Sequence, residues 1–539
     1  MLEKNRLYIV AAALVFLVSV SITGCQSEDK ISNKPNIVFV FTDDHASHAI
    51  SAYGSDIIET PNMDRLANEG ILFRNAFVTN SICAPSRAVL LTGKHSHVNG
   101  QLTNGQEFDG DQLTFPKILQ EAGYQTALIG KWHLQSNPTG YDHWDILPGQ
   151  GHYYNPEFIT QERTHQIEGY VTDIITDKVI NWIDDKQNSD QPFMVSYHHK
   201  APHRNWKPHP DDLGMFDDVK IPEPETLFAN WSGELTDEQA SEDVIDVELK
   251  NRTSAVETQE MTLMNHFYKG WDLKFPPDSI EIETRHLDLW KSRYNRFTEE
   301  QKAEWDQVFG KYYQEYNESE LEGAERLSWI YQRYIKDYLS TIKSVDDNLG
   351  RLLDYLDEEG LADNTIIIYA SDQGFFLGDH GWYDKRWMYE ESLRFPLMMR
   401  WPDGIEAGIE NNDLVQNIDL APTVVDFSGL DAPKEMQGMS LVPLTQNLTP
   451  DDWRSSIYYH YYEFPGAHEV QRHYGVRTDR YKLIHYYQID EWELFDLQKD
   501  PNEIQSVYND SEYSEIVNEL KAELQLLRDQ FQVPEEDSL

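Results

Sequence analysis

Apolar runs alternate with amphipathic segments along most of the chain. The run Asn36–Thr42 is almost continuously apolar, as expected of a strand buried on both faces of a parallel sheet. The same reasoning predicts further strands at 71–78, 124–129, 192–197, 365–370 and 395–399. Helices are predicted at 61–69, with Thr60 as N-cap, and at 84–92, 114–121, 169–184 and 328–358. This order predicts an α/β domain with a large, mostly parallel sheet flanked by helices.

Two parts of the chain depart from this alternation. Residues 205 to about 325 are polar, acidic and rich in Trp and Tyr, and we interpret them as an insertion of helices and long loops. After about residue 445 the pattern shortens, and the segments 474–477 and 481–486 flank a turn. With a helix over 512–531, this predicts a smaller C-terminal α+β domain over 446–539, following a main domain over 35–445.

The first 24 residues are typical of an export signal. Lys4 and Arg6 precede an apolar run over 8–20 that is short for a membrane span. The small residues before Cys25 resemble a bacterial lipobox, so we expect Cys25 to be lipidated and residues 25–34 to form a linker. The protein is then exported to the periplasm or the outer membrane and touches the membrane only through its lipid. The alternative is an ordinary signal peptide with an incidental cysteine.

The net charge of this 539-residue chain is −48, from 93 acidic and 45 basic residues. Such a charge argues against nucleic acid as a partner, and it also repels any other polyanion. Local basic residues must therefore bind an anionic ligand, if there is one. The chain has two cysteines, Cys25 and Cys83. If Cys25 is lipidated, the chain can form no internal disulfide. The alternative is a Cys25–Cys83 disulfide, which would tether Cys83 to the flexible leader.

Polar side chains follow four of the predicted strands, at the point where each strand ends. They are Asp43 and Asp44, then Lys131 and His133, then the group His198, His199, Lys200 and His203, and finally Asp372 and Gln373. In open α/β sheets, ligands bind outside the carboxyl ends of the strands. Any one of these groups could be a turn or a solvated loop, but four together predict one shared crevice.

The carboxylates in this set indicate a metal site. Two carboxylates about 4 Å apart, such as Asp43 and Asp44, repel each other by roughly 4 kcal/mol at an effective dielectric of 20, and a cation would relieve this. Asp372 and the amide oxygen of Gln373 complete an all-oxygen set. Oxygen ligands suit a hard cation such as calcium better than zinc. The alternative for Asp43 and Asp44 is a plain strand-exit turn.

One motif is specific enough to name a family. The run Cys83-Ala84-Pro85-Ser86-Arg87, followed by Leu91-Thr92-Gly93, resembles the signature of the type I sulfatases. In that family the cysteine of C-x-P-S-R is oxidised to formylglycine (3-oxoalanine). The segments at 36–44, 130–133, 371–374 and 493–501 are similar to other family signatures. The resemblance spans residues 35 to about 505 and implies an alkaline-phosphatase-like fold.

The resemblance also implies roles for the strand-end residues. One Ca2+ ion would be held by Asp43, Asp44, Asp372, Gln373 and the modified Cys83. The hydrated aldehyde would attack sulfur with one hydroxyl, giving a covalent sulfo-enzyme, and its second hydroxyl would then expel sulfate. A maturation enzyme must form the aldehyde. Several relatives carry Asn or His in place of Gln373, although an amide oxygen still suits calcium.

The remaining roles concern the sulfate and the leaving group. By resemblance, Arg87 would hold the formylglycine hydrate, Lys131 and Lys385 would bind the sulfate, and His133 would assist the nucleophile. His203 would protonate the leaving oxygen as general acid, and His199 remains an alternative. On sequence alone, Lys385 could instead be a surface lysine, and His203 could belong to a solvated loop.

We expect the substrate to be a sulfated polysaccharide. The lipoprotein leader, the acidic composition and the resemblance to bacterial polysaccharide sulfatases favour a sulfated glycan over a steroid or a lipid. Our hypothesis is an algal polysaccharide such as ulvan or carrageenan, with host glycosaminoglycan second. Trp206, Trp231, Trp271 and Trp290 could stack on sugar rings or simply pack in the core. Two other functions stay open: a phosphoester or phosphonate hydrolase of the same superfamily, and an inactive lipoprotein that binds sulfated glycans.

Overall fold

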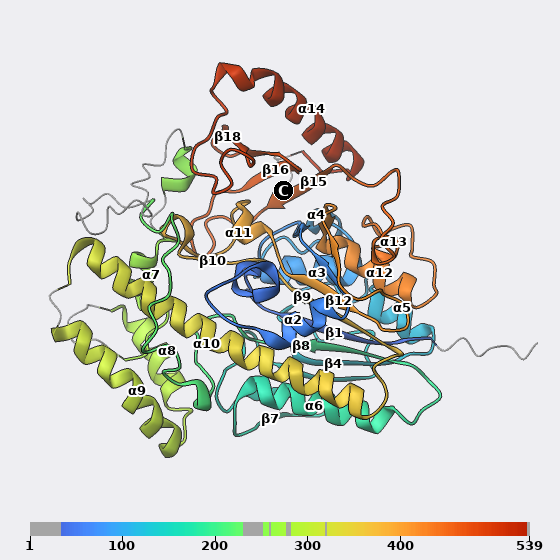
Figure 1. Ribbon diagram of the computed structural model, residues 1–539, viewed down its shortest axis with the longest axis horizontal. Coiled ribbons are helices and arrows are strands. Elements are labelled where there is room, and N and C mark those ends of the chain that lie inside the picture. Colours follow the sequence, from blue (N-terminus) through green and yellow to red (C-terminus); the bar gives the residue numbers. More distant parts are fainter. Residues whose placement is uncertain (1–33, 230–251, 258–259, 276–281, 319–320, 536–539) are drawn as a thin grey trace, which may run out of the picture. The chain divides into compact units, whose positions relative to one another are not determined.

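A ten-stranded sheet forms the centre of the fold in the computed structural model, which describes residues 34–229, 252–257, 260–275, 282–318 and 321–535 (Figure 1). The strand order is β13-β2-β12-β9-β1-β8-β4-β5-β6-β7. The bounds are β1 Asn36–Thr42, β2 Ile71–Phe73, β4 Gln125–Lys131, β5 His143–Leu147, β6 Glu157–Thr160, β7 Thr164–Gln166, β8 Phe193–His198, β9 Thr365–Ser371, β12 Leu397–Arg400 and β13 Ile409–Asn411. The five central strands from β9 to β5 are all parallel, whereas β12 runs antiparallel to both β9 and β2.

Helices cover both faces of this sheet (Figure 1). On one face lie α2 (Pro61–Asn68), α6 (Val171–Lys186) and the long α10 (Gly323–Glu358), and on the other lie α3 (Cys83–Thr92), α5 (Phe115–Glu121) and α12 (Leu420–Phe427). Strand β1 shows why the sequence forms a central strand. Ile37, Phe39 and Phe41 pack into one apolar cluster, and Val38 and Val40 pack into the other, so both faces of β1 are buried.

Two local predictions need correction. The strand predicted over 71–78 is divided into β2 and β3 (Ala76–Phe77), because β3 leaves the main sheet and pairs with β14 (Val415–Gln416). Thr60 occupies the N-cap position of α2 but makes no capping bond. Its hydroxyl instead accepts a hydrogen bond from the amide of Ser51, and the carboxylate of Asp346 in α10 accepts those of Asn62 and Met63.

The described parts of the predicted insertion are mainly helical. They contain α7 (Leu263–Lys269), α8 (Thr284–Tyr294) and α9 (Glu299–Glu318). Trp206 is fully buried, as the core-packing alternative expected. Trp231 and Cys25 lie outside the described residues. The shorter elements of the main domain are α4 (Ser96–Asn99), β10 (Phe376–Leu377), β11 (Tyr383–Asp384), α11 (Glu390–Leu393) and α13 (Val442–Thr445).

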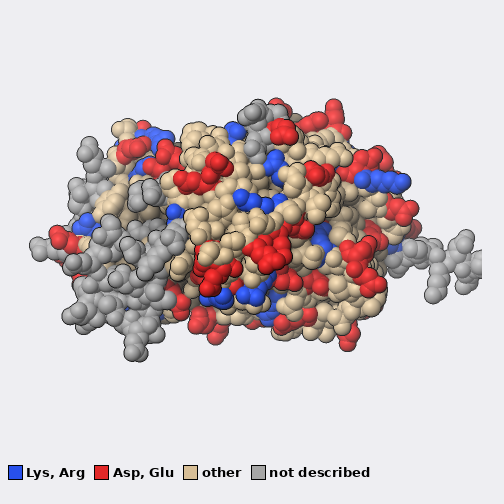
Figure 2. Space-filling model, turned by 90° about the horizontal axis from the view of Figure 1, so that it is seen from above, with Lys and Arg blue, Asp and Glu red and all other residues tan. Residues whose placement is uncertain are grey.

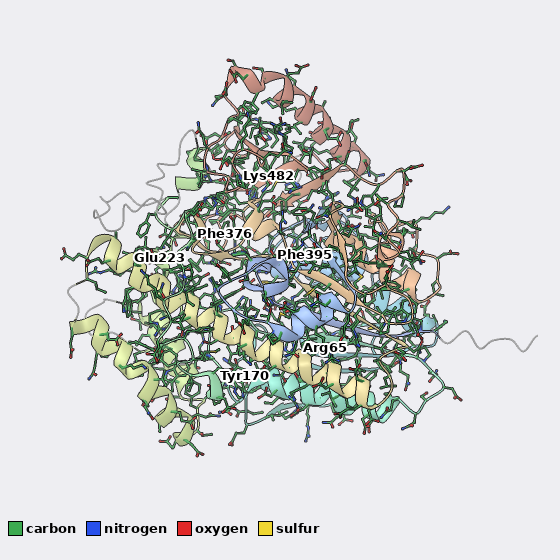
Figure 3. The ribbon with its side chains drawn as sticks, in the orientation of Figure 1. Arg65, Tyr170, Glu223, Phe376, Phe395 and Lys482 are labelled. Atoms are coloured by element: carbon green, nitrogen blue, oxygen red, sulfur yellow. The ribbon has the colours of Figure 1, made fainter. Side chains whose placement is uncertain are left out.

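The C-terminal part forms a separate antiparallel sheet of four strands: β15 (Ser456–Tyr461), β16 (His473–Thr478), β17 (Tyr481–Tyr486) and β18 (Glu491–Asp496). Helix α14 (Ser514–Gln530) packs on it through Val517, Leu520, Leu524 and Leu527. Lys482 of β17 (labelled in Figure 3) is fully buried and lies 2.9 Å from a carboxylate oxygen of Glu390 in α11, which joins the C-terminal sheet to the main domain. The predicted fold class is therefore confirmed. Among the helices of the described residues, none has the length and apolar character needed to cross a membrane.

Candidate active site

Three buried carboxylates meet at the carboxyl ends of the two central strands β1 and β9. Asp43 and Asp44 follow β1, Asp372 follows β9, and all three are fully buried. One oxygen of each lies within 4.8 Å of the others. The backbone amide of Asp44 donates a hydrogen bond to Asp372 Oδ1 at 3.0 Å, and Asp44 has a positive φ of 65°. These three carboxylates, which were predicted to converge because each follows a strand, therefore lie close together in the structure.

Three cationic side chains face these carboxylates. Lys131, at the end of β4, contacts Asp43, and Lys385, after β11, lies 2.7 Å from Asp44. The guanidinium of Arg87 donates two hydrogen bonds to Asp372 Oδ2, at 3.1 and 3.0 Å. A buried charge is costly unless it is paired, so this pairing explains how a charged cluster of this size can be buried. Lys385 is thus a buried ion-pair partner rather than a surface lysine.

Cys83 is the first residue of α3 and is also buried. Arg87 follows it by one helical turn, and the Arg87 Nη1 group donates to the carbonyl oxygen of Lys131 at 3.0 Å. Burial raises the pKa of the Cys83 thiol to about 12, although the charge of Lys385 opposes this. The reactive form of an unmodified cysteine is its thiolate, so this environment does not favour Cys83 as a thiol nucleophile.

The oxygen atoms at this site fit a hard cation. Asp43 Oδ1 and Gln373 Oε1 are buried and have no hydrogen-bond partner among the described residues. The Gln373 amide donates through Nε2 to Asp44 Oδ1 at 2.5 Å, which leaves its carbonyl oxygen available. Burial raises the pKa of Asp44 to about 6, and a bound cation would offset that cost. Unsatisfied carboxylate and amide oxygens are the donors that Ca2+ takes.

A glutamine that the sequence analysis did not find connects two of the predicted residues. The Gln150 side chain accepts a hydrogen bond from Lys131 Nζ at 2.5 Å, and its Nε2 lies 3.0 Å from His133 Nε2. Gln150 lies in the loop after β5, where no local pattern marks it. Burial lowers the pKa of His133 well below its usual value, and the charge of Lys131 acts in the same direction.

The structure separates the two candidate histidines that follow β8. His203 Nε2 lies 3.6 Å from Asp44 Oδ2, and its Nδ1 lies 2.6 Å from the carbonyl oxygen of Arg204. Because a carbonyl only accepts, Nδ1 must carry the hydrogen in this bond. His199 is fully buried and packs its ring 4.4 Å from that of Tyr197, and neither of its ring nitrogens has a partner among the described residues. The carboxylate cluster therefore lies next to His203.

A second group that sequence reasoning missed surrounds Lys385. The Asp384 carboxylate lies 3.3 Å from Lys385 Nζ, 2.6 Å from Arg386 and 2.5 Å from His468 Nε2. His468 belongs to the loop between β15 and β16 and is fully buried. The C-terminal domain thus supplies a residue to the site. The sequence gives no signal for His468, because it lies more than 80 residues from Asp384 and in no motif.

A cleft of about 290 Å³ lies beside the carboxylate cluster, with Gln150 and His203 in its wall. The cleft is lined by five Lys and Arg side chains: Lys200, Arg204, Lys207, Arg293 and Arg296. No Asp or Glu is among its described lining residues. Elsewhere acidic side chains are widespread, as Figure 2 shows for one face of the molecule. The local basic residues that the net charge required are therefore concentrated beside the carboxylate cluster.

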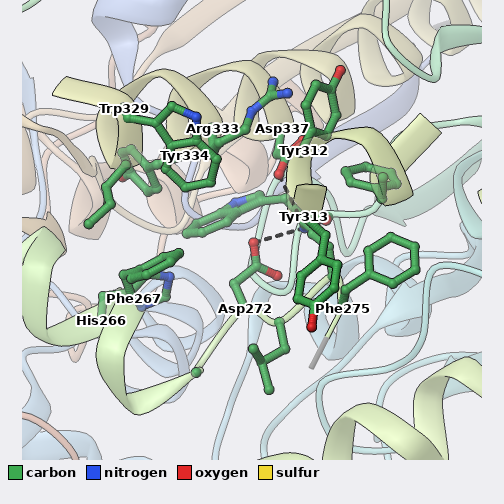
Figure 4. Close-up of a pocket in the computed structure, with 16 residues that line it drawn as sticks. His266, Phe267, Asp272, Phe275, Tyr312, Tyr313, Trp329, Arg333, Tyr334 and Asp337 are labelled. Carbon is green, nitrogen blue, oxygen red and sulfur yellow. Dashed lines mark hydrogen bonds and ion pairs between the residues drawn. The ribbon is translucent and has the colours of Figure 1, made fainter. Parts of the chain in front are cut away.

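An apolar pocket adjoins the cleft. The two cavities share Gly270 as a lining residue. The next residue, Trp271, lines the cleft, and the one after it, Asp272, lines the apolar pocket. In Figure 4 the rings of Phe275 and Tyr313 lie near Asp272, whose carboxylate lies 2.8 Å from Lys274 Nζ. This pocket holds none of the predicted site residues, so we place the chemistry in the cleft.

The fold and the buried site together define a hydrolase of the alkaline-phosphatase-like superfamily, with a Cys-x-Pro-Ser-Arg segment beside a carboxylate cluster. The sulfatase family model matches residues 35–430, and the chain belongs to the sulfatase family. A second family model, described as the C-terminal part of N-sulphoglucosamine sulphohydrolase, matches residues 378–530. The protein is therefore a sulfatase enzyme, as the resemblance implied.

The chain is similar to named sulfatases over nearly its whole length. It is 46% identical over 526 residues to an N-acetylglucosamine-6-O-sulfatase of Bacteroides thetaiotaomicron, covering 96% of this chain and 90% of that protein. A solved structure, described as a complex with its substrate D-glucosamine-2-N,6-O-disulfate, matches with a TM-score of 0.87 and 46% identity and covers 94% and 99% of the two chains. An ulvan-active sulfatase of Formosa agariphila is 24% identical over 534 residues, covering 95% and 85%.

Proposed function

We propose that this sulfatase removes the 6-O-sulfate from glucosamine residues of a sulfated glycosaminoglycan fragment. The observation that carries the proposal is the buried carboxylate cluster beside Cys83, next to a cleft that is lined with basic residues and that has His203 in its wall. The choice of sugar is supported by the relative at 46% identity, compared with 24% for the ulvan-active enzyme. We therefore propose a glycosaminoglycan in place of the algal polysaccharide that was expected from the sequence.

We propose that Asp43, Asp44, Asp372 and Gln373 hold one divalent cation, which we take to be Ca2+, together with a formylglycine made from Cys83. When bound, the cation neutralises the sulfate oxygens, and the hydrated aldehyde supplies a nucleophilic hydroxyl that a buried thiol does not. The unpartnered oxygens of Asp43 and Gln373 support the cation. The burial of Cys83 at the start of α3, one turn before Arg87, supports the modification.

The cationic residues of the site bind and orient the sulfate. Lys131 and Lys385 pair with Asp43 and Asp44, and we infer that both ammonium groups would also bind the sulfate oxygens, because a cation held by the carboxylates would share their charge. Arg87 is held by Asp372 and by the Lys131 carbonyl, and it fixes residue 83 from the same helix. Such preorganised charge is what stabilises a transition state that bears negative oxygens.

His203 is the residue placed to protonate the leaving sugar oxygen. It contacts the carboxylate cluster and also lines the cleft. The hydrogen bond from Nδ1 to the Arg204 carbonyl holds the ring, and Asp44 is the partner of Nε2 among the described residues. Burial lowers the pKa of His203, as does the charge of Lys131. The negative charge of an arriving sulfate ester opposes that effect and favours the protonated ring.

The test is sulfate release by purified, matured protein from a panel of defined saccharides. We expect release from glucosamine 6-sulfate and from 2-N,6-O-disulfated glucosamine, and little from the 3-O-sulfated isomer or from ulvan fragments. Exclusive activity on ulvan fragments would overturn the choice of sugar. A parallel assay with aryl phosphate tests the phosphoester alternative, which predicts a faster rate than on aryl sulfate.

Residue 83 can be tested in the same preparation. Mass spectrometry is expected to show a peptide with formylglycine in place of Cys83. Cys83→Ala is expected to retain the fold, because Ala fits the start of a helix, but to release no sulfate. Sulfate release by Cys83→Ala would refute the proposed nucleophile, and binding of substrate without any turnover in the matured wild type would favour the inactive glycan-binding alternative.

A further inference from the structure

The five basic side chains of the cleft differ in how they are paired. Two have a carboxylate partner: Arg296 donates to Glu157 at 3.0 Å, and Arg204 lies 3.4 Å from Asp384. Lys207 lies against two aromatic rings, 4.2 Å from the centre of the Trp305 ring and 5.0 Å from that of Phe297. The partners of these three hold them in the wall of the cleft, so they are less available to a ligand.

Lys200 and Arg293 are the other two. Lys200 Nζ donates to the carbonyl oxygen of Arg204 at 3.1 Å and lies 4.7 Å from the centre of the Tyr153 ring, and it faces no carboxylate within ion-pair distance among the described residues. The side chain of Arg293, in α8, makes no hydrogen bond or ion pair with the described part of the chain. Lys200 and Arg293 thus place positive charge in the cleft without a carboxylate at ion-pair distance among the described residues, in a protein with a net charge of −48.

These two cations act on each other. Burial lowers the pKa of Lys200 to about 7, and the charge of Arg293 is the next largest cause. The Asp44 carboxylate raises the pKa of Lys200 and the Asp272 carboxylate raises that of Arg293, but neither lies within ion-pair distance among the described residues. An anion between the two cations would add opposite charge at contact distance and relieve both effects. Both side chains line the cleft that contains His203, so this anion would lie on the side of the leaving sugar, away from the carboxylate cluster.

We propose that Lys200 and Arg293 form a subsite for a second anionic group of the glycan, distinct from the sulfate that is hydrolysed. This inference rests on the proposed function and makes the substrate a saccharide with at least two negative groups. A sulfate or a carboxylate fits, because the planar guanidinium of Arg293 can bind two oxygens at once while Lys200 adds a third donor. The group belongs either to the same sugar or to the adjoining one.

The test compares kcat/KM for substrates that differ only in the second charge. The three substrates are glucosamine 6-sulfate, its 2-N,6-O-disulfate, and a 6-sulfated disaccharide that carries a uronic acid. In Arg293→Met the advantage of a doubly charged substrate over the singly charged one is expected to fall by about tenfold to 100-fold, as for one lost charge-assisted hydrogen-bonding group. Methionine is a good helix former, so α8 is expected to persist.

Lys291→Met provides the matched control, because Lys291 is exposed on the same helix and does not line the cleft. This variant is expected to keep the wild-type ratios. If Arg293→Met lowers the kcat/KM advantage of the disulfate, the second anion is on the same sugar. If it lowers the advantage of the disaccharide alone, the second anion is on the neighbouring sugar. Unchanged ratios for both substrates in Arg293→Met would overturn the subsite, whereas absence of sulfate release by wild type from all three would instead overturn the proposed function.

Discussion

Replacing each of the two candidate histidines tests which of them is the general acid. His203→Ala removes the ring that lies between Asp44 and the cleft. Positioned general acids accelerate reactions by about 10²- to 10⁴-fold, which corresponds to about 3 to 5 kcal/mol of the activation free energy. We expect this loss in kcat for a sugar sulfate, because an alkoxide leaving group needs a proton.

The leaving group distinguishes this role from a structural one. The phenolate of 4-nitrophenyl sulfate leaves without a proton, so His203→Ala is expected to lose less than about tenfold on this substrate. Both substrates are assayed with the same preparation, so a partly unfolded variant would lose activity equally on both. The quantity to report is therefore the ratio of the two losses, which does not depend on the active fraction.

His199→Ala is the matched control. His199 packs against Tyr197 and is not among the described residues that line the cleft, so its removal leaves a cavity and costs stability. It is expected to lower the melting temperature and to affect the two substrates alike. Equal losses on both substrates in His203→Ala, or a loss confined to the sugar sulfate in His199→Ala, would refute the assignment of the acid to His203.

Three further predictions concern stability and the metal. Lys482→Met leaves the buried carboxylate of Glu503 without its ammonium partner, whereas Glu390 keeps Arg394 and Arg477. It should cost about 3 kcal/mol in denaturant unfolding; an unchanged midpoint would contradict this. Burial lowers the pKa of His209, but its hydrogen bond to Asp173 outweighs this and raises the net pKa. The pair therefore stabilises the fold below pH 6.5, and its contribution, under about 1 kcal/mol, is lost as the pH rises through the raised pKa. Asp173→Asn should remove this pH dependence of the melting temperature. A chelator should lower the melting temperature and stop sulfate release, and added Ca2+ should restore both; full activity in the chelator would contradict the metal site.

The sequence predicts those parts of the site that depend on local pattern. Asp43 and Asp372 were identifiable because each directly follows a run of apolar residues, and the carboxyl ends of parallel strands lie at one edge of the sheet. Neighbouring strands β1 and β9 place the two residues together, with Thr42 directly opposite Ser371. Where the chemistry depends on the end of a strand, periodicity alone locates the residue.

Residues recruited from distant segments have no such signal. Gln150 lies in a loop, Arg293 in a helix of the insertion and His468 in a loop of the C-terminal domain. Only the tertiary fold brings Gln150 and Arg293 to the cleft and His468 to Asp384. The same limit explains why Thr60 occupies the predicted N-cap position of α2 without making a capping bond. The cap of α2 comes from Asp346, 284 residues away from Asn62, so a local capping pattern could not identify it.

A net charge of −48 is compatible with an anionic substrate, because the acidic surface and the basic side chains of the cleft act on the substrate over different distances. At physiological ionic strength the Debye length is about 8 Å, so exposed acidic groups farther away than this are largely screened. The carboxylates of the cluster are each faced by a buried cation, and no described acidic side chain lines the cleft. An anion that enters the cleft therefore meets positive charge at contact distance. The acidic surface sets how slowly such a ligand approaches at low salt, whereas the cleft sets how tightly it binds.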